Sequence, residues 1–235
     1  MALPIVTSIK YETVIPSMNK TVEFRPYVVK EEKILMIAME SKDQAQIVMA
    51  LKDVIGACVS QSIDTSKLTM FDIESLFLRL RSKSVGENVE VTLKCTECSH
   101  PHPIDINLDE VKVPEVFEAN KTISINDQIG IVMRYPSIDD MKQYSEEQLG
   151  SVDGIMSLMV DCIVTIFDAD NVYNTADEPR KNIVDFIESL SSGQFGKIAK
   201  FFSEMPGLVH VIDFNCKKCS TDNTLELKGI QSFFM

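Results

Sequence analysis

The sequence predicts an α+β protein in which two distant pairs of cysteines meet at the ends of β-strands. Three observations predict this fold class. Alternating apolar and polar residues, typical of half-buried strands, occur near the start, in the middle and near the end of the chain. Apolar residues spaced three and four positions apart, as on the buried face of a helix, occupy much of the remainder. Four of the six cysteines form two Cys-x-x-Cys pairs, each following an alternating stretch.

The composition is that of a folded protein with an acidic surface. The chain has 235 residues, of which 45% are hydrophobic and 25% charged, so it can bury a sizeable core. The formal net charge of −12 disfavours binding to nucleic acid. No run approaches the roughly 18 apolar residues of a membrane span, and the first residues lack the basic segment of a secretion signal. We therefore expect a protein of the reducing cytosol, without a membrane span.

Residues 1–88 are expected to form a first block, a β-hairpin followed by helices. Alternation over residues 5–29 predicts two strands. Helical spacing over residues 30–59 predicts two helices. A third helix is expected to begin at Thr69, whose hydroxyl can cap it, and to end before residues 86–88.

Residues 89–110 and 207–235 are expected to form one discontinuous module that resembles a zinc ribbon. Its two parts, VEVTLKCTECSHPHPIDINL and LVHVIDFNCKKCSTDNTLEL, each contain a strand, a Cys-x-x-Cys knuckle, a polar turn and another strand. Beyond the cysteines the identity is slight, so the likeness predicts a repeated local structure and is weak evidence for duplication.

Residues 111–206 are predicted to be an insertion in this module, made of a hairpin and a helical block. The hairpin comprises residues 122–125 and 129–135. Residues 168–179 are expected to form a polar connection. The expected helices cover residues 137–140, 152–167, 180–190 and 194–204.

One structural zinc ion is predicted to be held by Cys95, Cys98, Cys216 and Cys219. Zinc prefers four such sulfur ligands in closed tetrahedral sites, and a knuckle at a hairpin tip directs two thiolates at one point. More than a hundred residues separate the two pairs, where roughly 15 to 20 are usual. The ion would therefore close a very long loop and contribute directly to folding.

Two other interpretations of the cysteines remain open: two separate redox or free-thiol pairs, and a cluster or a site that includes histidine. A redox pair usually begins a helix, whereas both pairs here follow strands. His100 and His102 lie beside prolines and are expected in an exposed turn outside the ligand shell. Cys58 and Cys162 lie on apolar helix faces and are expected to be buried. Because no catalytic motif is present, we expect no enzymatic activity and no small-molecule substrate.

Several short segments resemble a known family: Phe24-Arg25-Pro26-Tyr27, Lys30-Glu31-Glu32-Lys33, the central Cys-x-x-Cys and Met133-Arg134-Tyr135-Pro136-Ser137. Together they resemble the small baseplate hub proteins of T4-like contractile-tailed phages, over nearly the whole chain. The resemblance implies a hub subunit or hub-assembly protein that binds other baseplate hub or tail proteins and catalyses no reaction. It also implies a location in the host cytoplasm during assembly, and leaves open a place in the tail baseplate of the virion.

The segments also suggest partner contacts through Arg25, Tyr27, Arg134 and Tyr135, since arginine and tyrosine are frequent interface anchors. The alternative, which the sequence favours equally, is that these residues lie at Pro-flanked strand ends and only stabilise corners of the fold.

Two further functions were weighed against the baseplate role. One is a zinc-ribbon module that binds nucleic acid or takes part in transcription, with phosphate contacts from Lys94, Lys217 and Lys218, although acidic residues surround these lysines in the sequence. The other is a thiol oxidoreductase.

Overall fold

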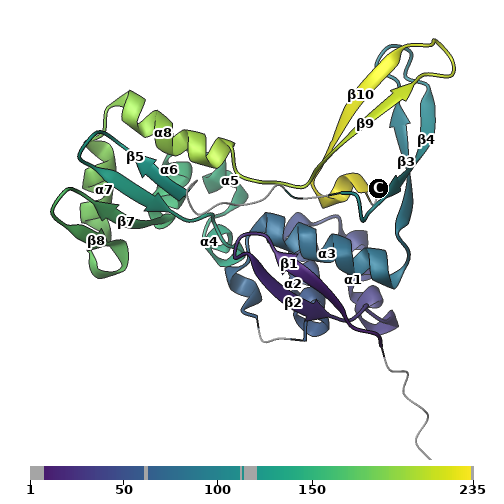
Figure 1. Cartoon of the computed structure of the whole chain (residues 1–235), viewed down its shortest axis with the longest axis horizontal. Helices are drawn as coiled ribbons and strands as arrows, with labels where there is room; N and C mark the ends of the chain where they lie inside the picture. The colour runs from purple at the N-terminus through teal and green to yellow at the C-terminus, as the bar shows by residue number, and fades with distance from the viewer. Residues whose placement is uncertain (1–7, 61–62, 112, 114–120, 234–235) are drawn as a thin grey trace, which may run out of the picture. The chain divides into compact units, whose positions relative to one another are not determined.

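The computed structural model describes residues 8–60, 63–111, 113 and 121–233 (Figure 1). The chain forms two compact units: unit 1 comprises Met1–Pro114 and Gly207–Met235, and unit 2 comprises Glu115–Pro206. Both combine helices with small antiparallel sheets, so the fold is of the mixed α and β class that the sequence predicts. Among the described residues, no helix is both long enough and apolar enough to span a membrane.

Unit 1 begins with a hairpin and three helices. The elements are β1 (Tyr11–Ile15), β2 (Lys20–Phe24), α1 (Val29–Ser41), α2 (Gln44–Cys58), the 3-10 helix η1 (Thr65–Lys67) and α3 (Met70–Ser84). Alternation along the hairpin places Ile15, Val22 and Phe24 in the core. As expected, Thr69 caps α3: its hydroxyl accepts the Asp72 backbone N–H, and the Asp72 carboxylate accepts the N–H of Thr69 in return.

Two further hairpins complete unit 1. They are β3 (Asn88–Lys94) with β4 (Pro101–Asn107), and β9 (Val209–Asn215) with β10 (Asp222–Lys228). The 3-10 helix η4 (Ile230–Phe233) follows β10 and buries Phe233 completely. The Ile230 backbone N–H donates to the Glu74 carboxylate of α3 at 3.2 Å, which joins the end of the chain to the first helical block.

Unit 2 has one four-stranded antiparallel sheet with the order β5-β6-β7-β8 and a set of helices. The strands are β5 (Thr122–Ser124), β6 (Gly130–Met133), β7 (Ile163–Phe167) and β8 (Val172–Asn174). The helices are α4 (Ile138–Lys142), α5 (Glu146–Leu149), α6 (Val152–Asp161), α7 (Arg180–Glu188), α8 (Ser192–Ser203) and the 3-10 helix η3 (Thr175–Asp177). The hairpin predicted at residues 122–135 is β5-β6, as expected.

The single helix predicted over residues 152–167 is wrong. α6 ends at Asp161, and residues 163–167 form β7, which pairs with β6. An apolar run is compatible with either a buried helix or a buried strand, and the β-branched residues of IVTIF favour the strand. The connection expected at residues 168–179 also contains β8 and η3.

Candidate metal centre

Each cysteine pair lies at the tip of a hairpin of unit 1 whose strands have seven residues each. The Cys95 backbone N–H donates to the His100 carbonyl at 3.0 Å, and the Cys216 N–H donates to the Thr221 carbonyl at 2.9 Å. These bonds close the two turns that carry the cysteines. The strand-then-knuckle arrangement is therefore the one that the alternating sequence predicts.

The structure brings the four predicted cysteines together. Their sulfur atoms all lie within 4.8 Å of one another. Cys95 Sγ is 3.6 Å from Cys219 Sγ, and Cys98 Sγ is 3.6 Å from Cys216 Sγ. A tetrahedron of sulfurs around zinc, with bonds of roughly 2.3 Å, has edges of about 3.8 Å. The cluster thus has the size of a four-sulfur metal site, and its cysteines could hold a metal ion.

Burial and hydrogen bonding differ among the four thiols. Cys95 and Cys216 are buried, whereas Cys219 is exposed. Hydrogen bonding with the Thr221 side chain lowers the pKa of Cys219 to about 6. A hydrogen bond from the His100 backbone lowers the pKa of Cys98, yet desolvation and the neighbouring thiols outweigh it and raise that pKa to about 12. Four ionised sulfurs in this space therefore require a positive charge among them.

His102 lies against the cluster and is buried, so the expectation of an exposed turn is wrong for this residue. Its Nε2 is 3.3 Å from Cys216 Sγ, and its ring packs on Phe214 with centroids 5.2 Å apart. Only 4% of its surface is exposed. β4 begins directly at Pro101, and pairing of His102 with Leu93 turns the imidazole inward. Around a four-sulfur site the histidine would be a hydrogen-bonding neighbour of Cys216.

Asn223 is a second buried polar residue that the sequence interpretation missed. Its Oδ1 accepts both the Thr96 backbone N–H and the Thr96 hydroxyl, each at 2.9 Å, and its Nδ2 donates to the Thr221 carbonyl at 2.9 Å. The side chain therefore links the knuckle of its own hairpin with the opposite one. Its place among the inward positions of an alternating strand was the available signal, and so was that of His102.

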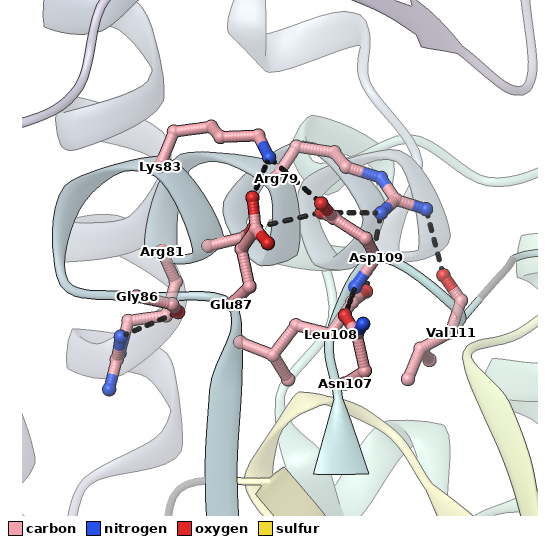
Figure 2. Close-up of polar contacts among 10 residues, drawn as sticks. Arg79, Arg81, Lys83, Gly86, Glu87, Asn107, Leu108, Asp109 and Val111 are labelled. Carbon is pink, nitrogen blue, oxygen red and sulfur yellow. Dashed lines mark hydrogen bonds and ion pairs between the residues drawn. The ribbon is translucent and has the colours of Figure 1, made fainter.

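The base of the first knuckle hairpin is anchored to α3, as Figure 2 shows. The Arg79 guanidinium donates to the carbonyls of Leu108 and Val111 at 3.2 and 2.8 Å and to the Asp109 carboxylate at 3.2 Å. Lys83 donates to the same carboxylate at 2.8 Å and lowers the pKa of Asp109. These bonds hold the segment that follows β4 against α3.

The candidate partner residues lie at corners that their own side chains stabilise. Arg25 donates to Glu31 at 2.9 Å and to the Ala57 carbonyl at 3.1 Å, and Tyr27 stacks on Phe77. The Tyr27 and Phe77 rings are both buried, and Tyr27 is only 8% exposed.

In unit 2, Arg134 forms a bidentate pair with Asp140 and donates to the Asp161 carbonyl at 2.8 Å, while Tyr135 stacks on Phe201. The alternative of structural corners accounts for all these contacts. Partner contact through the four residues stays a prediction.

Comparison with known proteins adds one finding. A family model described as "T4 bacteriophage base plate protein" matches residues 8–235, and it confirms the resemblance to T4-like phage baseplate proteins; the hub itself stays a prediction. Searches of curated proteins and of solved structures gave no match.

Proposed function

Because this chain belongs to the T4 bacteriophage base plate protein family, we propose that it is a structural or assembly subunit of the central hub of the tail baseplate. It binds other hub proteins, and neither an enzymatic reaction nor a small-molecule substrate is part of its role. It acts in the host cytoplasm during assembly and reaches the tail baseplate with its partners. The observation that carries the proposal is the family match over nearly the entire chain.

The proposal includes one structural zinc ion in the four-cysteine cluster. Four soft sulfur ligands select zinc over the hard cations that prefer oxygen. The ion turns the two hairpins into a discontinuous zinc-ribbon-like module, because it joins hairpin tips that the residues of unit 2 separate along the chain. A closed shell of four protein sulfurs leaves no position for a substrate, which supports a structural rather than a catalytic ion.

Exposed apolar side chains on α1 support a role in binding other proteins. Val29, Met36, Ile37 and Met39 are each about half exposed or more, although helices of monomeric proteins usually turn such residues inward. Two of them, Met36 and Met39, line a groove of about 560 Å³ formed by α1, α2, α3 and η4. Methionines adapt their shape to a partner surface. We assign this face to a hub protein that presents apolar side chains.

Co-expression with the other hub proteins tests the proposal. We expect one zinc per chain by elemental analysis and a complex with at least one hub protein by native mass spectrometry. Met36→Asp should lower capture of that partner at least tenfold, whereas Lys30→Asp, on an exposed position of the same helix that does not line the groove, serves as the matched control. Absence of any complex with hub proteins would contradict the proposed role. Salt-sensitive binding to DNA would instead favour the nucleic-acid module.

A further inference from the structure

The two units contain the same backbone corner. The Arg25 backbone N–H donates to the Cys58 carbonyl at 3.0 Å, and the Arg134 N–H donates to the Cys162 carbonyl at 2.8 Å. Both arginines directly follow the second strand of a hairpin, and both cysteines are buried at the end of a helix. The strand residue before each arginine pairs with the residue after the cysteine.

The arginine side chains repeat the same contacts. Each guanidinium donates to the carbonyl just before its cysteine, and each forms an ion pair with an acidic residue at the third position of the next helix. The pairs are Arg25 with Ala57 and Glu31, and Arg134 with Asp161 and Asp140. Each acidic residue also accepts the backbone N–H of the residue that caps that helix. Each corner further holds a tyrosine stacked on a phenylalanine of the helix that leads to a cysteine hairpin.

The cysteine hairpins are equivalent as well. All four strands have seven residues, and in both hairpins the first residue of one strand faces the last residue of the other. Ser99 and Ser220 follow the second cysteine with positive φ angles of 55° and 59°. In each hairpin, the backbone N–H of the residue that follows the second strand donates to the carbonyl of the residue that precedes the first strand. The two bonds are Leu108 to Glu87 and Gly229 to Leu208.

We propose that residues 8–113 and 121–233 are two copies of one module, and that the cysteine-bearing hairpins are the surface through which one copy pairs with the other. The order of elements is the same in both: hairpin, arginine corner, helices, buried cysteine, capped 3-10 turn, final helix and cysteine hairpin. The second copy differs by having three shorter helices, α4, α5 and α6, in place of α1 and α2, and by the β7-β8 hairpin and α7. Those additions shift the spacing between matching residues, which hides the repeat from a simple comparison of the two halves.

The contacts between the hairpins are reciprocal. The first cysteine of each knuckle faces the second cysteine of the other: Cys95 faces Cys219, and Cys216 faces Cys98, both at 3.6 Å. A two-fold interface between identical surfaces produces this reciprocity. The partner that each hairpin fits is therefore another copy of the same hairpin, here supplied by the same chain.

His102 and Asn223 occupy the same position in the two hairpins, as the second residue of β4 and of β10. Both are buried, and both reach across to the opposite knuckle. His102 contacts Cys216, and Asn223 contacts Thr96, which follows Cys95. They act as positioning residues that hold the facing turn in place.

Exchanging these two residues in the full-length chain tests the equivalence. The double variant His102→Asn/Asn223→His should keep its metal affinity within about threefold, because each residue then faces the equivalent position of the opposite knuckle. His102→Ala and Asn223→Ala should each lower the affinity about 10- to 100-fold, as expected for residues that orient metal ligands. If the exchange lowers the metal affinity by as much as the two alanine substitutions do together, the proposal is overturned.

A second measurement does not depend on these variants. A full-length variant is made with a protease site inserted between residues 113 and 121. It is allowed to fold and is then cleaved at that site. Native mass spectrometry should find the two pieces still paired one to one, sharing a single ion. Pieces that separate in the presence of zinc, or that each carry an ion of their own, would contradict pairing through the hairpins. A paired complex without any ion would overturn the zinc proposal and leave the module pairing supported.

Discussion

Replacing Asp140 by Asn should lower the stability of unit 2 by about 2 kcal/mol at neutral pH, and by much less in acid. Burial raises the pKa of Asp140, but hydrogen bonds from Arg134 and Ser137 outweigh it and lower that pKa from 3.8 to about 2. One pKa unit corresponds to about 1.4 kcal/mol, so the shift is worth about 2.4 kcal/mol. Asp140 is only 9% exposed, but the Arg134 side chain is 40% exposed, so solvent screens part of this interaction and we expect about 2 kcal/mol.

The sign follows from the lowered pKa in the folded state. The stabilisation is fully present above the unfolded pKa of 3.8 and disappears as the pH falls through about 2. The difference between the native protein and Asp140→Asn should therefore shrink from about 2 kcal/mol at pH 6 to below about 1 kcal/mol at pH 2.5.

Hydrogen exchange of unit 2 peptides over a urea series, read by mass spectrometry, measures this difference. Asp127→Asn, an exposed change in the loop between β5 and β6, is the matched control and should stay within about 0.5 kcal/mol of the native protein at every pH. A difference that stays constant or grows on acidification would refute the reasoning.

Three further changes test other parts of the structure. Cys216→Ser should abolish binding of the single zinc ion and lower the melting temperature of unit 1 by more than 10 °C; an unchanged melting curve would count against a structural ion. Gly130→Ala should destabilise unit 2 by about 1–3 kcal/mol in urea denaturation, because a Cβ there meets the Phe167 ring at 2.2 Å, whereas Gly196→Ala has open space and should be neutral or stabilising. Glu31→Gln should lower the free energy of unfolding by about 2 kcal/mol in urea denaturation, because it leaves the partly buried Arg25 guanidinium without its charged partner. A change below about 0.5 kcal/mol would show that the Arg25–Glu31 pair does not stabilise the fold.

Local sequence patterns predicted much of the secondary structure. Alternation placed β1, β2 and the strands that precede the cysteines, and the capping hydroxyl of Thr69 placed the start of α3. These features depend on residues close in sequence, which is where periodicity and capping act. The meeting of the two cysteine pairs was predictable for another reason: four thiols in two such pairs suit a single tetrahedral ion.

Other features depend on contacts between distant residues and left little trace in the sequence. The end of α6 at Asp161 is fixed partly by Arg134, which binds the Asp161 and Cys162 carbonyls from 27 and 28 positions away in the chain. No helix-breaking residue marks this boundary. Likewise, the burial of His102 is completed by the second hairpin lying against the first, and its inward position in the alternation of β4 is the one local indication of it.

The separation of the two knuckles along the chain sets an order of events during synthesis. Cys216 follows Cys98 by 118 positions, so at roughly 5–20 residues per second the ribosome needs about 6 to 24 s between them. Unit 2 is translated entirely within that interval, so it can fold before the second cysteine hairpin has been synthesised. Until the second hairpin emerges, the first one holds reactive thiols without its counterpart, and a nascent polysome brings many such halves close together. Exchange of hairpins between neighbouring chains is therefore the assembly error to which this architecture is most exposed.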